Sequence, residues 1–131
     1  MPWVEVFAVL VISHLVGDFL VQTEWQASNK LGGLSGPPTA RRALLAHITT
    51  YTLCFVPVLI WLAGSIGWAA VGIGVLIAVP HYVQDDGRLL SAYLLRVKRT
   101  PSAQPGDLLY VAVDQAFHLL ALFCVALLAA A

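Results

Sequence analysis

The sequence predicts an all-α integral membrane protein built as a four-helix bundle. Of its 131 residues, 60% are hydrophobic and 11% are charged, a balance far from that of a soluble domain of this length. The apolar residues fall into four long segments, each near the ~20 residues that cross a bilayer core. These segments occupy most of the chain, so we expect a single four-span domain over residues 1–131 and no soluble domain.

The four predicted spans cover residues 3–22, 41–63, 66–84 and 108–130. The first has no basic N-terminal region and carries charge in its middle, which favours a retained helix over a signal peptide. Gly64 and Gly67 bracket a turn short enough to make the second and third spans an antiparallel hairpin. Pro80 predicts that the third helix is kinked, or that it restarts as an amphipathic extension at the interface. Asp107 is placed to cap the last helix.

Basic residues predict the orientation in the cell (inner) membrane. All of them lie in or beside the first and third connections: Lys30, Arg41, Arg42, Arg88, Arg96, Lys98 and Arg99. The positive-inside rule therefore places these connections in the cytoplasm and both termini outside. The first connection, residues 23–40, is rich in Gly, Ser and Pro and is predicted to be a loop. Because the basic residues bracket spans without interleaved aromatic residues, nucleic-acid binding is not expected.

Three pairs of histidine and aspartate lie inside or at the ends of the predicted spans, four residues apart. They are His14 with Asp18, His81 with Asp85, and Asp114 with His118. Four residues make about one helical turn, so both members of a pair project from one face and can chelate one ion. His47 has no acidic partner on its own helix. Counted at about 1.5 Å per residue, all these groups lie within roughly 15 Å of the predicted cytoplasmic face.

Aspartates inside a membrane need compensation. Each costs about 2.5 to 3.5 kcal/mol at a helix centre on insertion scales, so the three must face inward and be paired. Hydrogen bonds to histidine, a proton or ion pathway, or a divalent metal can provide the pairing. The candidate metal ligands are His14, Asp18, His47, His81, Asp85, Asp114 and His118. Seven groups exceed the needs of one tetrahedral ion and predict one or two ions, with Zn, Mn or Fe favoured over Mg by the imidazoles.

Simpler interpretations stand beside the metal site. A lone His or Asp in a membrane helix is more often a packing or snorkelling residue than a ligand. Asp85, next to Asp86 at a helix end, is the member most readily explained as solvated charge. Cys54 and Cys124 fall within apolar spans without any CxxC pattern and are predicted to be small buried hydrophobes.

Several further residues are expected to support the ligands or to bind an anion. Gln22, Gln115 and Tyr51 are predicted hydrogen-bond partners of the ligands, with Gln22 one turn beyond Asp18. Arg88 is predicted to belong, with the basic residues at positions 30, 41 and 42, to a cationic rim for an anionic lipid head group. The rim has an ordinary explanation too, because basic residues flank the helices of any protein with this topology.

Four motifs occur in order along the chain: HLVGDFLVQTEW from His14, AHITTY over 46–51, HYVQDDGR over 81–88 and VDQAFH over 113–118. Together they resemble the family of small bacterial and phage membrane proteins catalogued as domain of unknown function 3307. The resemblance covers nearly the whole chain and implies a four-helix membrane fold with a shared polar constellation. The sequence is also distantly similar to membrane-bound metal-dependent hydrolases. Arg88 stands where the family pattern leads us to expect lysine, and arginine favours bidentate contact with phosphate or carboxylate.

Three functional hypotheses follow. The first is a metal-dependent hydrolase acting on a lipid-like ester or phosphoester from the cytoplasmic leaflet, with Asp18, Asp85 and Asp114 as candidate catalytic groups. The second is a metal-ion or proton transport or channel subunit, which is disfavoured because Glu5 is the only charge in the outer half. The third is a non-catalytic membrane scaffold or accessory protein. Gly72 and the Ala-rich last helix offer surfaces for a homo-oligomer, and no GxxxxGK or GxSxG motif is present.

Overall fold

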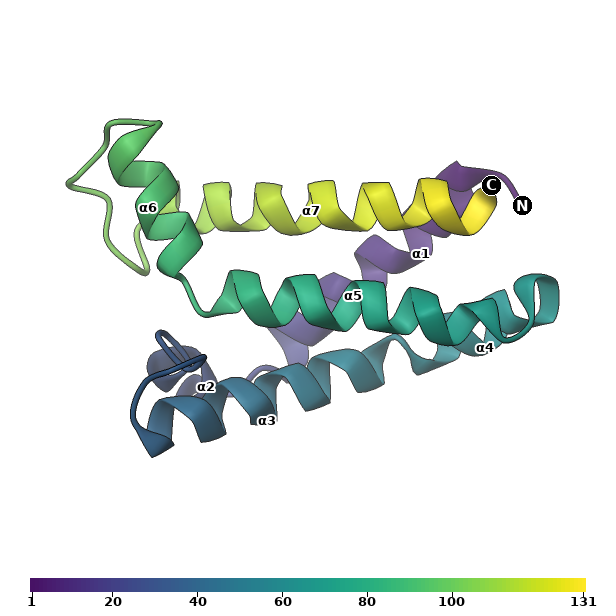
Figure 1. Cartoon of the computed structure of the whole chain (residues 1–131), viewed down its shortest axis with the longest axis horizontal. Helices are drawn as coiled ribbons and strands as arrows, with labels where there is room; N and C mark the ends of the chain where they lie inside the picture. Colours follow the sequence, from purple (N-terminus) through teal and green to yellow (C-terminus); the bar gives the residue numbers. More distant parts are fainter.

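The computed structural model describes residues 1–131 and contains seven α-helices, one π-helical segment and no strand. In chain order these are α1 (Trp3–Leu15), the π-helix η1 (Val16–Val21), α2 (Glu24–Asn29), α3 (Pro38–Cys54), α4 (Val56–Ile66), α5 (Ala69–Asp85), α6 (Arg88–Arg96) and α7 (Leu108–Ala130). Figure 1 shows α2, α6 and the loop after α6 at one end of the molecule. Both termini lie at the other end, with the turn from α4 to α5.

The apolar helices identify a membrane protein. Two helical stretches are long and apolar enough to cross a membrane, Trp3–Val21 and Leu108–Ala130, and a third follows if the bent pair α3 and α4 forms one span. The helix α5 is apolar but shorter, with 17 residues. Large apolar side chains are exposed along the bundle, among them Leu20, Ile60, Trp68, Val71 and Leu128. Such a surface suits hydrocarbon rather than water, and the chain is therefore an all-α membrane protein with two or three candidate spans.

The second predicted span, residues 41–63, is two helices instead of one. The axis bends by 51° between the end of α3 at Cys54 and the start of α4 at Val56. Pro57 lies in the first turn of α4, where it has no N–H to donate and its ring excludes the preceding turn of a continuous helix. Phe55 fills the bend and is fully buried. The apolar composition predicted a helical segment here, but the two helices extend three residues beyond the predicted bounds at each end, and the break was not predicted.

The helix containing Pro80 does not restart at the proline and ends at Asp85, one residue beyond the predicted span. The helix α5 continues through Pro80, and the chain turns only at Gly87, which has φ +78°. The left-handed φ at this corner favours glycine, and a Cβ at Gly87 would also displace the end of the Leu31 side chain, 2.6 Å away. The amphipathic helix predicted after the proline is α6, a separate element that starts at Arg88 and buries Leu90 and Leu94.

The first connection contains a helix where a loop was predicted. The helix α2 starts with a capping box, in which the Thr23 hydroxyl accepts a hydrogen bond from the Gln26 N–H at 3.2 Å. The Gln26 side chain in turn accepts from the Thr23 N–H at 3.0 Å. At the last helix, Asp107 occupies the N-cap position, but its carboxylate accepts from the Gln104 N–H at 2.8 Å and not from the helix.

The interior of the bundle has an apolar half and a polar half. The helix α7 contacts α1 and α5, and α5 also contacts α3 and α4. Toward the termini these helices enclose one apolar core: Val6, Leu10, Tyr51, Phe55, Leu62, Ala70, Ile73, Ile77, Leu122, Val125, Ala126 and Ala129. Toward α2 and α6, the same helices enclose the histidines and aspartates.

Candidate metal centre

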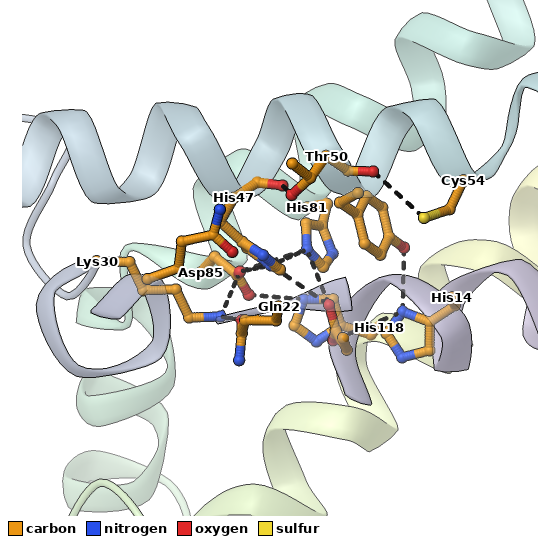
Figure 2. A network of polar contacts seen from close by, with 12 residues as sticks. His14, Gln22, Lys30, His47, Thr50, Cys54, His81, Asp85 and His118 are labelled. Carbon is orange, nitrogen blue, oxygen red and sulfur yellow. Dashed lines mark hydrogen bonds and ion pairs between the residues drawn. The ribbon is translucent and has the colours of Figure 1, made fainter. Parts of the chain in front are cut away.

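The polar half of the bundle brings together side chains from four segments of the chain (Figure 2). The fully or almost fully buried members are His14, His47, His81, His118, Asp18 and Asp85, none more than 8% exposed. Asp114 is the least buried of the seven predicted ligands, with a side chain 24% exposed. Three overlapping groups have ligand atoms close enough for metal: His14, Asp18 and His81; His47, His81 and Asp85; and Asp85, Asp114 and His118. The sequence therefore identified which residues meet.

Four ligand atoms form the tightest part of this cluster. His47 Nε2 lies 3.1 Å from His81 Nε2, 2.8 Å from Asp85 Oδ2 and 3.3 Å from Asp18 Oδ1. His81 Nε2 lies 3.3 Å from Asp85 Oδ2 and 3.4 Å from Asp18 Oδ1. Ligand atoms bound about 2.0 to 2.1 Å from a tetrahedral zinc ion are about 3.3 Å apart. In these five pairs, the two nitrogens and two oxygens have close to the spacing of a tetrahedral ligand set.

Beside these four atoms, His118 Nε2 and Asp85 Oδ1 face one another. His118 Nδ1 donates a hydrogen bond to the backbone carbonyl of Asp114 at 2.8 Å, because a carbonyl can only accept. In the neutral imidazole, His118 Nε2 therefore carries a lone pair, and it faces Asp85 Oδ1 at 3.2 Å. Both of these buried atoms have no hydrogen-bond partner. A second proton on the ring or a metal ion between the two atoms would satisfy them.

His14 stands behind Asp18 rather than beside the four-atom set. Its Nε2 donates to Gln115 Oε1 at 2.8 Å, and its Nδ1 accepts from the Tyr51 hydroxyl at 3.0 Å. The Gln115 amide then donates to Asp18 Oδ2 at 3.1 Å, whereas His14 itself is 3.7 Å from that oxygen. Both ring nitrogens of His14 are thus engaged, and the His14 and Gln115 side chains orient the Asp18 carboxylate.

Asp18 is positioned by the π-helix η1. The Gln22 N–H donates to the Gly17 carbonyl at 3.1 Å, five residues back, which is the wider π spacing. A Cβ at Gly17 would lie 2.6 Å from the Tyr51 ring, so glycine lets this ring reach the site. The Tyr51 ring stacks on His81, with centroids 3.4 Å apart and planes 7° apart. Neither the π-helix nor the stacking was predicted, although a Gly beside an intramembrane Asp is a signal for such close approach.

Lys30 points into the cluster and not outward into the cationic rim that the sequence predicts. Its Nζ donates to Asp85 Oδ2 at 2.6 Å and to Gln22 Oε1 at 2.7 Å. Gln22 therefore accepts its hydrogen bond from Lys30. The predicted hydrogen bond between Gln22 and a ligand such as Asp18 is not formed. Because Lys30 lies in the connection between two helices, its spacing along the chain gave no indication that it reaches Asp85.

Asp86 and Arg88 form a separate structural pair outside the cluster. Asp86 is 2% exposed and accepts from the Arg88 Nε at 2.6 Å and Nη2 at 3.1 Å. It also accepts from the Leu34 N–H at 2.8 Å, so it joins the first connection to the corner between α5 and α6. The interpretation of Asp85 and Asp86 as solvated helix-end charges was wrong, because both are buried. The guanidinium predicted to bind an anion has Asp86 as its partner.

A polar cavity connects the cluster with the outside of the bundle. A cavity of about 290 Å³ reaches it between α2, α5 and α7 and is lined by Asp18, Gln22, Lys30, Asp85, Asp114 and Gln115, among others. Three carboxylates meet a single ammonium there, and buried carboxylates without a paired cation are costly. Further positive charge on the imidazoles or a divalent ion would balance them. Asp18 Oδ1, a member of the four-atom set, likewise has no hydrogen-bond partner, so the residues present fit a metal ion.

The fold and the cluster together define a helical membrane protein whose buried His and Asp groups could bind metal. Residues 6–131 match the family described as Protein of unknown function (DUF3307), and the chain belongs to that family. The resemblance seen in the four sequence motifs is thereby confirmed. No curated protein and no solved structure matches the chain.

Proposed function

We propose that this protein is a membrane-embedded, metal-dependent hydrolase that acts on a lipid-like ester or phosphoester from the cytoplasmic leaflet. One observation carries the proposal: His47 Nε2, His81 Nε2, Asp18 Oδ1 and Asp85 Oδ2 lie 2.8 to 3.4 Å from one another in the five pairs described above. This spacing suits zinc, and the mixture of imidazole and carboxylate also suits Mn or Fe.

A second ion has a place beside the first. Asp85 Oδ2 belongs to the four-atom set and Asp85 Oδ1 faces His118 Nε2, so Asp85 would help to hold both ions. Asp114 completes the second group. Carboxylate and histidine sites of this kind are known inside other helical bundles.

In the proposed hydrolysis, the metal ion and the protein side chains have different roles. A bound divalent ion would supply a Lewis acid and activate water near neutral pH. When only the four-atom set holds an ion, Asp114 is unligated and is the candidate general base, because it is the least buried carboxylate of the cluster and lines the cavity. Lys30 places an ammonium at the same cavity, where it can hold an anionic group of the substrate.

The proposed membrane arrangement has four spans. The fourth is α5, which is shorter than the other three candidates. Its 17 residues extend about 26 Å, close to the roughly 30 Å hydrocarbon core. The basic connections would lie in the cytoplasm and both termini outside, in agreement with the common location of α2 and α6 at one end of the bundle. The cavity then faces the cytoplasmic leaflet.

Transport is the weaker alternative. A conducting path needs polar groups at successive depths toward both faces. The half of the bundle nearer the termini is filled by the apolar core, including the fully buried Leu10, Phe55 and Leu62. Because this apolar packing leaves no polar path toward the termini, it favours a site that is reached from the end of the bundle with α2 and α6.

Metal analysis of the purified full-length protein tests the proposal. We expect one or two equivalents of Zn, Mn or Fe per chain, and hydrolysis of bis(p-nitrophenyl) phosphate or p-nitrophenyl butyrate that a chelator abolishes. Asp85→Asn keeps the side-chain volume and should remove both metal and activity, whereas Asp107→Asn, at an exposed helix cap, should remove neither. A metal-free wild-type protein whose stability is unaffected by chelators would support the scaffold hypothesis instead.

A further inference from the structure

A mainly apolar groove lies beside the candidate metal centre. It has a volume of about 230 Å³ and is lined by Gln84, Leu89, Leu90, Asp114 and Phe117, from α5, α6 and α7. Pockets that enclose a whole drug-sized ligand have about 300 to 1,000 Å³. The groove is therefore suited to one chain-like segment of a ligand and not to a whole molecule.

The groove adjoins the polar cavity described above. Gln84 and Asp114 line both spaces, which places the two volumes on either side of these residues. The Gln84 amide donates to the Phe117 carbonyl at 3.2 Å and thereby holds α5 against α7 at this junction. A ligand that fills both spaces has one polar end beside Lys30 and Asp114 and one apolar end beside Leu90 and Phe117.

The depth of the groove indicates where its ligand comes from. Asp114 and Phe117 lie about 9 Å and about 14 Å along α7 from its first residue, Leu108. Leu89, at the edge of the groove, is 62% exposed, and Leu108 is 87% exposed. In the proposed orientation this edge lies at the depth where the hydrocarbon chains of the cytoplasmic leaflet begin, just below the head groups. The groove therefore opens sideways into lipid.

From these observations we infer that the groove binds one hydrocarbon chain of a membrane lipid, whose phosphate-bearing head occupies the polar cavity. The choice of head group rests on the proposed function, whereas the place of the chain does not. Because lipid tails are as apolar as leucine, the groove adds little affinity of its own. It gives the chain a path that lets the head reach the polar cavity, where Lys30 and the bound ion of the proposed function would attract the anionic head.

Photolabelling tests the inference. The full-length protein is placed in phosphatidylcholine nanodiscs with a small fraction of hexadecyl phosphate that carries a diazirine midway along its chain. After irradiation, mass spectrometry maps the labelled residues. We expect label to concentrate at 84–90 and 114–117, severalfold above Leu128, a lipid-exposed position far from the groove. The corresponding diazirine alcohol, without phosphate, should label these residues less.

Two matched variants complete the experiment. Leu89→Trp fills the mouth of the groove and should reduce labelling at 114–117 severalfold, whereas Leu95→Trp, an exposed residue of α6 outside the groove, should not. Labelling spread evenly over lipid-facing residues, equal labelling by the alcohol, or no effect of Leu89→Trp would overturn the inference. Metal content is measured in the same samples. Groove labelling without metal would leave the place of the chain standing and remove the proposed function together with the choice of head group. Metal without groove labelling would overturn the inference and leave the metal centre in place.

Discussion

The two halves of the bundle use the same helices for opposite purposes. On the N-terminal helix, Val6 and Leu10 belong to the apolar core, and His14 and Asp18 follow within two turns in the polar cluster. On α7 the order is reversed, since Asp114 and His118 precede the buried apolar residues that begin at Leu122. Antiparallel helices with inverted patterns therefore align apolar with apolar and polar with polar, and the boundary lies at one depth.

The halves differ in what their residues need. The apolar core depends mainly on close packing, because Tyr51 is its only member with a polar group that needs a partner. The polar half depends on each group meeting another, and its carboxylates exceed its one lysine. We therefore expect substitutions in the polar half to change metal affinity, and substitutions in the apolar half to change stability alone.

Among residues that hold the ligands in place without binding metal themselves, we expect substitution of Gln115 to reduce zinc affinity most. Gln115→Leu has a similar size but removes the link between His14 and Asp18, so the Asp18 carboxylate loses its orientation. Partners of this kind usually contribute about 10-fold to 100-fold in metal affinity. Competition between the purified protein and a zinc chelator of known affinity measures this loss. Gln104→Leu, at an exposed position in the loop before α7, is the control and should bind zinc as the wild type does.

An unchanged zinc affinity in Gln115→Leu would contradict the role given to this residue. It would mean that Asp18 is held by the helix backbone alone, or that Asp18 is not a ligand.

The smallest expected effect on metal affinity comes from the apolar half. Leu10→Ala removes a fully buried side chain and should lower the free energy of unfolding by about 2 kcal/mol, the lower end for such a truncation. The low value is expected because the separated helices face lipid rather than water. Zinc affinity should stay at the wild-type value. Reversible unfolding in mixed detergent measures the first quantity and chelator competition the second, and a large loss of zinc affinity would show that the halves are not independent.

The sequence predicted the polar cluster well because its information is local. A histidine and an aspartate four residues apart share a helix face whatever the rest of the chain does, and three such pairs in inward-facing positions must meet. The all-α membrane class followed as directly from the apolar segments.

The features that were missed depend on contacts between distant segments. Lys30 reaches Asp85 only because α2 and the following turn bring it there, and the sequence around Lys30 suggests an ordinary loop. The burial of Asp86 likewise depends on Leu34 and Arg88 closing over it. The π-helix around Asp18 reflects the fit between Gly17 and a tyrosine on another helix, which no helical periodicity encodes.

X-ray absorption spectroscopy of the zinc-loaded protein tests the central claim most directly. We predict a first shell of four nitrogen and oxygen atoms at about 2.0 to 2.1 Å, with the outer-shell scattering of two imidazoles from His47 and His81. At one zinc ion per chain, held by the four-atom set, His81→Gln should reduce the imidazole contribution by half. A shell that contains sulfur at about 2.3 Å, a shell of water oxygens without imidazole, or a protein that binds no zinc would contradict the claim that the buried cluster is a metal centre.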